Sequence, residues 1–125
     1  MPFEVVQSDD LPKSTLPFSP AVRANGFIFV SGQASVGDDG KIVADTFENE
    51  FRRSMDNVKR ILAAAGATLA DVVQVRAYVD DPANLPAYNE LYREYFKPPL
   101  PVRTTIMQCL AGVVKFEIDV VAVER

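Results

Sequence analysis

Arg103 and Glu117 are ionisable residues inside two runs, 102–109 and 115–123, that are otherwise typical of β-strands. Charges are rarely placed on core-facing strand positions without a partner, because removing water from an unpaired charge is costly. The chain has no histidine, which excludes Ser-His-Asp and Cys-His catalysis and removes the commonest zinc ligand. Any chemistry must therefore use carboxylates, hydroxyls, arginine, backbone groups or water. The alternative is that Arg103 and Glu117 form a salt bridge on a partly exposed sheet, which needs no function.

The second run has two different faces, since successive side chains on a strand point to opposite sides. One face is apolar throughout and is predicted to be core: Phe116, Ile118, Val120 and Ala122. The other begins with Lys115, Glu117 and Asp119 and becomes apolar at Val121 and Val123. A face that changes from charged to apolar within one strand is typical of the wall of a cleft or of a subunit interface.

Length and composition predict one compact domain over residues 1–125 in a cytoplasmic protein. The net charge is −4 and the basic residues are scattered, which disfavours nucleic acid as a partner. No apolar stretch is long enough to span a membrane, and the first ten residues lack the pattern of a signal peptide. The single cysteine, Cys109, excludes an internal disulfide, and we expect it to be a small buried side chain.

The pattern of elements predicts an α+β domain with a mixed sheet and two helices on one face. A strand at 27–31 is followed by an amphipathic helix, with Asp45 as its N-cap, Glu48 as the capping-box partner and Gly66 as its left-handed cap. A strand at 72–79 follows, with Val73, Val75, Ala77 and Val79 on one face. A second helix starts at Asn84 and ends before Pro98.

Two helices cannot cover both faces of a sheet of five or six strands. We expect Arg103 and Glu117 on the uncovered face, and its apolar residues favour cover by another subunit, so a homo-oligomer is predicted. Asn89 lies inside the apolar stripe of the second helix, where its amide needs a partner. That partner is either a nearby backbone group or a ligand.

Five segments, in this order along the chain, resemble the RidA (YjgF) family of enamine/imine deaminases. These segments are Ser31-Gly32-Gln33, Ser54-Met55-Asp56-Asn57-Val58, Tyr88-Asn89-Glu90-Leu91-Tyr92, Pro101-Val102-Arg103 and Phe116-Glu117-Ile118. The resemblance implies a chorismate-mutase-like fold and a homotrimer with clefts between subunits. It also implies cofactor-independent hydrolysis of 2-enamine or 2-imine acids, such as 2-aminoacrylate, to 2-keto acids and ammonia.

The resemblance also implies roles for individual residues. Arg103 would bind the substrate carboxylate, a task that suits the planar guanidinium, and Glu117 would activate water and move protons. Thr105 stands where the family commonly has a cysteine whose backbone carbonyl positions that water. Ser31, Gly32 and Asn89 would line the cleft together with Phe18, which replaces the tyrosine usual in the deaminases.

Three alternatives remain open at this point. The cleft could bind small carboxylate metabolites without turnover, or it could deaminate a larger enamine such as an aminomuconate, which the apolar Phe18 makes more credible. The third is a ribonuclease or translation inhibitor, an activity attached to some relatives, against which the acidic balance and the absence of histidine count. No metal is expected.

Overall fold

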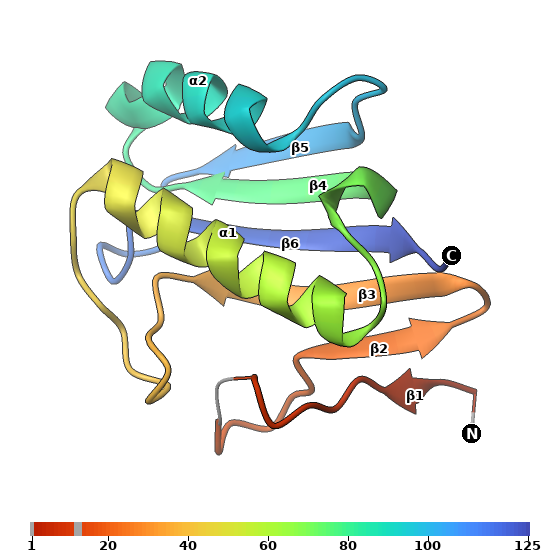
Figure 1. Cartoon of the computed structure of the whole chain (residues 1–125). Helices are drawn as coiled ribbons and strands as arrows, with labels where there is room; N and C mark the ends of the chain where they lie inside the picture. Colours follow the sequence, from red (N-terminus) through yellow and green to blue (C-terminus); the bar gives the residue numbers. More distant parts are fainter. Residues whose placement is uncertain (1, 12–13) are drawn as a thin grey trace.

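The computed structural model describes residues 2–11 and 14–125 and places a six-stranded mixed sheet under two helices (Figure 1). The strands are β1 (Glu4–Val5), β2 (Ala21–Ala24), β3 (Phe27–Ala34), β4 (Val72–Val79), β5 (Val102–Met107) and β6 (Phe116–Val123). Their order across the sheet is β1-β2-β3-β6-β4-β5, and only the β4–β5 pair is parallel. The predicted α+β class, with both helices on one face, is confirmed.

The helices are α1 (Phe47–Ala64) and α2 (Leu85–Tyr95), with short 3₁₀ turns at Leu69–Asp71 and Pro82–Asn84. α2 lies in the crossover between the parallel strands β4 and β5, as a parallel pair requires. No helix among the described residues is long and apolar enough to cross a membrane.

α1 is capped one residue later than predicted. Thr46 is the N-cap, since its hydroxyl accepts a hydrogen bond from the backbone N–H of Asn49 at 3.2 Å. The Asp45 carboxylate instead accepts from the Asn49 amide and pairs with Arg53 at 3.4 Å. The prediction that Glu48 is the capping-box partner of Asp45 was also wrong, because it is Glu50 whose carboxylate accepts the backbone N–H of Asp45. Beyond the C-terminus, Gly66 has the left-handed conformation predicted for it, with φ of 81°.

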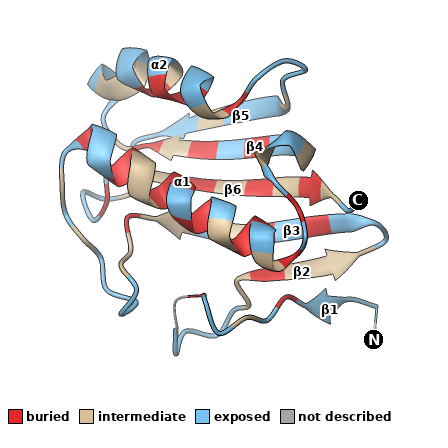
Figure 2. Ribbon diagram, in the orientation of Figure 1, coloured by how far each residue is buried: buried red, intermediate tan, exposed pale blue. Residues whose placement is uncertain are grey.

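The core fills the space between the helices and the face of the sheet that they cover, here called the helix face (Figure 2). The alternation predicted for β6 is confirmed, because Phe116, Ile118, Val120 and Ala122 are all buried. The prediction for Val73 was wrong: the register of β4 against β6 shifts between Val72 and Gln74, and this bulge leaves Val73 exposed.

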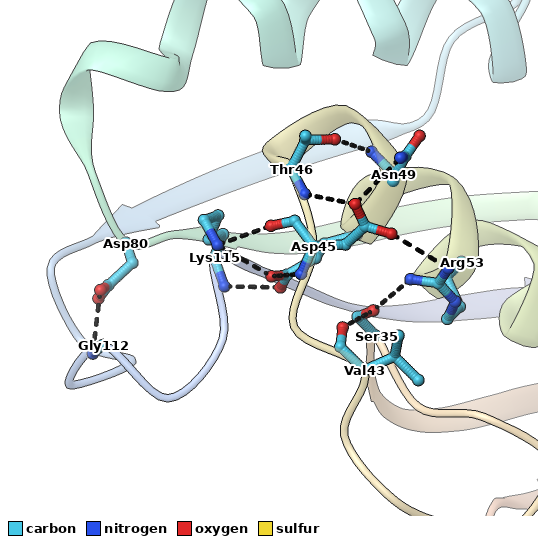
Figure 3. Close-up of polar contacts among 10 residues, drawn as sticks. Ser35, Val43, Asp45, Thr46, Asn49, Arg53, Asp80, Gly112 and Lys115 are labelled. Atoms are coloured by element: carbon cyan, nitrogen blue, oxygen red, sulfur yellow. Dashed lines mark hydrogen bonds and ion pairs between the residues drawn. The ribbon is translucent and has the colours of Figure 1, made fainter.

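The buried carboxylate of Glu50, in the first turn of α1, fixes the start of β6. It is 1% exposed and accepts the backbone N–H of Lys115 at 2.9 Å and the Lys115 ammonium at 3.3 Å. Figure 3 shows Lys115 reaching the Asp45 segment, beside the contacts of Arg53 with Asp45 and Ser35. These contacts anchor the chain at Lys115, which directly precedes β6 and lies two residues before Glu117.

The loop between β5 and β6 is held by Asp80, whose carboxylate accepts the backbone N–H groups of Leu110 at 2.9 Å and Gly112 at 3.1 Å. Cys109 lies in this loop and is exposed, so the prediction that it is buried was wrong. β5 ends at Met107, and the positive φ of Gln108 turns the chain out of the sheet before it reaches Cys109.

Candidate functional site

Arg103 and Glu117 lie on opposite faces of the sheet. Arg103 is in register with Val75, which is buried under the helices, so its side chain is on the helix face. Glu117 alternates with buried Phe116 and Ile118 and therefore lies on the face without helices, here called the open face. The expectation that both residues share the open face was wrong for Arg103. β5 is an edge strand with polar and apolar residues on both faces, so only its register with β4 decides on which side Arg103 lies.

The two charged groups of one chain do not meet. Glu117 pairs with Tyr78 of β4, which pairs with Ile106 of β5, so two strand spacings, roughly 10 Å, separate β6 from β5. Arg103 stands three residues before Ile106, which adds about 10 Å along the strand. Since the side chains also point to opposite faces, one small ligand cannot contact both within a single chain.

The first group of candidate residues, here called the glutamate half-site, contains Phe18, Ser31, Gly32 and Glu117. The register of β3 against β6 shifts between Val30 and Gln33, which places a bulge at Ser31 and Gly32. The Glu117 carboxylate lies against Gly32: a Cβ added there would be 3.2 Å from the carboxyl carbon and closer still to Oε2. The absence of a side chain at Gly32 therefore makes room for Glu117.

Burial raises the pKa of the Glu117 carboxyl above its ordinary value of 4.5, and the negative charge of Asp119, two residues along the same face, raises it further. Asp119 is itself bonded by Arg76 at 2.9 Å and by the Tyr78 hydroxyl at 2.7 Å. In the single chain it is thus Asp119, rather than Arg103, whose charge acts on Glu117. A raised pKa brings the carboxylate closer to the range useful for proton transfer.

The substitution Gly32→Ala is expected to lower kcat by about tenfold to 100-fold, because the new methyl group displaces the Glu117 carboxylate and a misplacement of about 1 Å has effects of this size. Gly37→Ala is the matched control, since its added Cβ would meet its neighbours at 3.4 Å or more. Steady-state kinetics and thermal unfolding of both variants check the prediction. Equal activities for the two would contradict the contact between residue 32 and Glu117.

Phe18 is 54% exposed and lines a cavity of about 210 Å³, which Gly32 also lines but Glu117 does not. The lining is largely apolar and comes from the segment 14–20, β3 and α1: Leu16, Phe18, Pro20, Gly32, Val36 and Ile61 are part of it. Ser31 holds this segment, because its hydroxyl donates to the Ser19 carbonyl at 2.6 Å and its backbone N–H to Pro20 at 2.9 Å. Its hydroxyl therefore has a structural role.

The second group, here called the arginine half-site, contains Tyr88, Asn89 and Tyr92 of α2 with Arg103 and Thr105 of β5. The guanidinium carbon of Arg103 is 4.9 Å from the centre of the Tyr88 ring and 4.8 Å from that of Tyr92. The Tyr88 hydroxyl and the Thr105 hydroxyl are 3.1 Å apart. Asn89 is half-buried and its side-chain amide makes no hydrogen bond with the described residues, so its predicted partner stays undetermined.

Arg103 differs from most other arginines of the chain, because it forms no ion pair with a described carboxylate. Six others do so: Arg23, Arg52, Arg53, Arg60, Arg76 and Arg125. Arg103 is nevertheless ordered against two aromatic rings and exposed on its other side. An exposed guanidinium without a carboxylate partner is suited to binding an anion.

Sequence reasoning missed two kinds of residue at these half-sites. Tyr88 and Tyr92 entered the sequence analysis only as part of a segment that resembles the family, although their spacing of four residues put both rings on the side that faces β5. Asp119 was recognised as a neighbour of Glu117, but its effect on the Glu117 pKa was not. That effect follows from the i, i+2 spacing on one strand face.

The open face, on which Glu117 lies, also carries exposed apolar side chains. Phe27 and Phe29 of β3 are exposed there, and Ile106 of β5 lies on the same side. Val121 and Val123 of β6 are half-buried beside the two phenylalanines. Phe27, Phe29, Val121 and Val123 thus form an apolar patch, and exposed patches of this kind often mark a protein interface.

Comparison with known proteins defines the class of this fold and site. A family model described as Endoribonuclease L-PSP matches residues 8–124. A RutC family protein of Pyrococcus horikoshii is 35% identical over 121 residues, which cover 95% of this chain and 96% of that protein. The crystal structure of Escherichia coli TdcF with bound serine has a TM-score of 0.85 at 28% identity. The matched region covers 98% of this chain and 99% of the TdcF chain.

The chain therefore belongs to the Endoribonuclease L-PSP family, also called the YjgF, RidA or RutC family, and has its chorismate-mutase-like fold. The resemblance found in the sequence is confirmed. One relative is named Reactive Intermediate Deaminase A, a chloroplastic protein of Arabidopsis thaliana. It is 33% identical over 121 residues, which cover 95% of this chain and 65% of that protein. The family thus includes reactive intermediate deaminases.

Proposed function

We propose that this chain is a cofactor-independent hydrolase that converts 2-enamine and 2-imine acids, such as 2-aminoacrylate, to 2-keto acids and ammonia. The observation that carries the proposal is Arg103, a guanidinium exposed on one side with no described carboxylate partner. Its planar fork matches a substrate carboxylate, which it would hold in two parallel hydrogen bonds.

Glu117 is assigned the proton transfers. The enamine first tautomerises to the imine, whose C2 is electrophilic. A water molecule then attacks C2, Glu117 takes one of its protons, and the C=N π bond gives its electrons to nitrogen. Glu117 returns this proton to the nitrogen, which gives a carbinolamine. Glu117 then takes the hydroxyl proton of the carbinolamine and passes it to the amino nitrogen, the C–N bond breaks, and NH3 leaves as the C=O bond forms. Orientation of the water and one proton-transfer group supply the acceleration.

Thr105 is assigned a backbone role, in which its carbonyl positions the attacking water. Its side-chain hydroxyl is already engaged by Tyr88, which supports this division of tasks. Ser31, Gly32, Asn89 and Phe18 are assigned to the walls of the cleft, with Gly32 also giving Glu117 its room.

The site is proposed to lie between the subunits of a homotrimer, with the arginine half-site of one copy facing the glutamate half-site of the next. Two observations support this arrangement. The half-sites of one chain point to opposite faces of the sheet, and the open face on which Glu117 lies carries exposed apolar side chains. A symmetric assembly would bury that surface and complete each cleft.

The direct test is to generate 2-aminoacrylate from serine with a dehydratase and to measure ammonia and pyruvate release with and without the protein. A rate increase that scales with protein concentration supports the proposal. Pyruvate binding without any turnover would instead identify a non-catalytic module for small carboxylates, and neither binding nor turnover would reject both.

The pH dependence gives a further prediction, because Asp119 contributes to the raised pKa of Glu117. The base must be ionised, so kcat/KM is expected to fall on the acid side through the pKa of Glu117. Asp119→Asn removes the negative charge, lowers that pKa and moves this acid limb to lower pH. A pH–rate profile of both proteins measures the shift. An unmoved limb would mean that another group controls it.

A larger, apolar enamine acid is a second candidate substrate, favoured by the 210 Å³ cavity beside Phe18. An apolar cavity of about 150 Å³ holds a benzene molecule, so this one has room for a branched or aromatic side chain. Comparing kcat/KM for the imines derived from alanine and phenylalanine tests it. Faster turnover of the phenylalanine imine is the expected result if this candidate is correct.

A nuclease activity is not proposed, although the family model carries that name. A net charge of −4 with scattered basic residues provides no basic groove for phosphates. A cytoplasmic location remains a prediction, since one relative named above is chloroplastic.

A further inference from the structure

Two tyrosines of α2 form a corner in which the Arg103 guanidinium rests. The ring centres of Tyr88 and Tyr92 are 5.8 Å apart and the ring planes are inclined by 64°. Arg103 is within 4.9 Å of both centres, a distance at which a cation is attracted to the face of an aromatic ring. Both rings are buried, with exposed fractions of 0% and 6%, so the corner is part of the rigid core.

We propose that Tyr88 and Tyr92 are positioning residues, which hold the Arg103 guanidinium in its substrate-binding orientation without neutralising its charge. The inference rests on the proposed function, because it takes Arg103 to bind the substrate carboxylate. It adds the means by which an unpaired arginine is kept ordered.

The physical reason lies in the difference between a carboxylate and an aromatic ring as a partner for arginine. A carboxylate would occupy the N–H donors and cancel the positive charge. A ring attracts the guanidinium without cancelling its charge. The Tyr88 hydroxyl can engage one N–H of Arg103, and the other donors remain available. Burial raises the pKa of Tyr88, and that of Tyr92 to about 12, so both rings are neutral at physiological pH.

Another tyrosine on the same helix shows the contrast. Tyr95 is also placed against an arginine, Arg52, with 6.0 Å from the ring centre to the guanidinium carbon. Arg52 donates hydrogen bonds to Glu48 at 3.1 Å and Glu94 at 3.2 Å, so its donors and its charge are used within the chain. Only the pair of rings on the β5 side leaves its arginine free of described carboxylates.

Tyr88 also connects Arg103 to Thr105. A buried phenol hydroxyl needs a hydrogen-bond partner, and the Thr105 hydroxyl, 3.1 Å away, provides it. The same contact fixes the position of the hydroxyl end of Tyr88 beside β5. Threonine at 105 is therefore matched to tyrosine at 88, since a cysteine thiol is a weaker partner.

The test uses Tyr88→Leu, Tyr92→Leu and the conservative Tyr88→Phe, with Tyr95→Leu as the matched control. KM and kcat are measured with 2-aminoacrylate, the inhibition constant with pyruvate, and stability by thermal unfolding. The leucine variants at 88 and 92 are expected to raise KM and the pyruvate inhibition constant about 5- to 30-fold, the effect of losing a cation–π contact, with kcat changed much less. Tyr88→Phe keeps the ring and is expected to retain most of the affinity.

Tyr95→Leu is expected to lower stability while leaving KM unchanged. This control separates the loss of Arg103 positioning from the general effect of removing a packed tyrosine. In an Arg103→Ala background, Tyr88→Leu should cause no further rise in KM. The inference is overturned if the wild type is active and the 88 and 92 variants keep its KM, or if Tyr95→Leu raises KM equally. A wild type that neither turns over 2-aminoacrylate nor binds pyruvate overturns the proposed function itself.

Discussion

Arg103→Ala is expected to lower kcat/KM for 2-aminoacrylate about 10³-fold, the scale of losing one partner of a desolvated, hydrogen-bonded charge pair. Pyruvate should lose its affinity in parallel, because the same guanidinium holds the carboxylate of substrate and product. The melting temperature should change little, since Arg103 is exposed and makes no ion pair with the described residues. Steady-state kinetics and calorimetric binding of pyruvate measure these effects.

Arg103→Lys separates charge from geometry. Lysine keeps the positive charge but has neither the planar fork nor the flat face that stacks on Tyr88 and Tyr92. We expect it to recover only a small part of the lost activity. Arg93→Ala is the control, because Arg93 is an exposed arginine on α2 without an ion pair to the described residues. If Arg93→Ala were as damaging as Arg103→Ala, the assignment of the anchor would be wrong.

Glu117→Gln is expected to lower kcat about 10²- to 10⁴-fold, the usual contribution of general acid–base catalysis. Pyruvate binding should survive, since the amide fills the same space and Arg103 is intact. Glu124→Gln, just beyond the end of the same strand, is the control and should retain full activity. Retained turnover in Glu117→Gln would show that another group moves the proton.

The same variant has a predicted effect on stability, with a sign fixed by the pKa. Because the pKa of Glu117 is raised in the folded state, folding favours the protonated carboxyl, and the ionised form destabilises the fold. That penalty is fully present above the raised pKa and is absent below the ordinary value of 4.5. Glu117→Gln should therefore be more stable than the wild type at pH 7, and the difference should disappear as pH falls. Thermal unfolding at several pH values measures it.

Local patterns were sufficient for much of the fold. The alternation in β6 predicted its buried face correctly, because the two bulges lie in the neighbouring strands β3 and β4 and β6 itself is regular. The spacing of apolar residues predicted that α1 is a helix, and Gly66 predicted where the helix ends. These features depend on side chains within one element, which the sequence places directly.

Features that depend on contacts between distant segments could not be predicted in the same way. The exposure of Val73 results from a bulge against β6, and the face of Arg103 from its register with β4. The helix cap moved from Asp45 to Thr46 because Arg53 and Asn49 engage the Asp45 carboxylate. The residue types at the candidate site were visible in the sequence, whereas its division into two half-sites became visible only with the strand order.

The proposed site between two subunits is tested most directly by mixing inactive variants. Arg103→Ala retains Glu117, and Glu117→Gln retains Arg103, so a cleft that takes one half-site from each variant has both groups intact. Unfolding equal amounts together and refolding them should restore about a quarter of the wild-type activity, the fraction of clefts in a randomly mixed ring that receive the intact pair. Each variant refolded alone should remain inactive. A mixture of assembled oligomers that is no more active than the two variants separately would contradict a site built from Arg103 of one copy and Glu117 of the next.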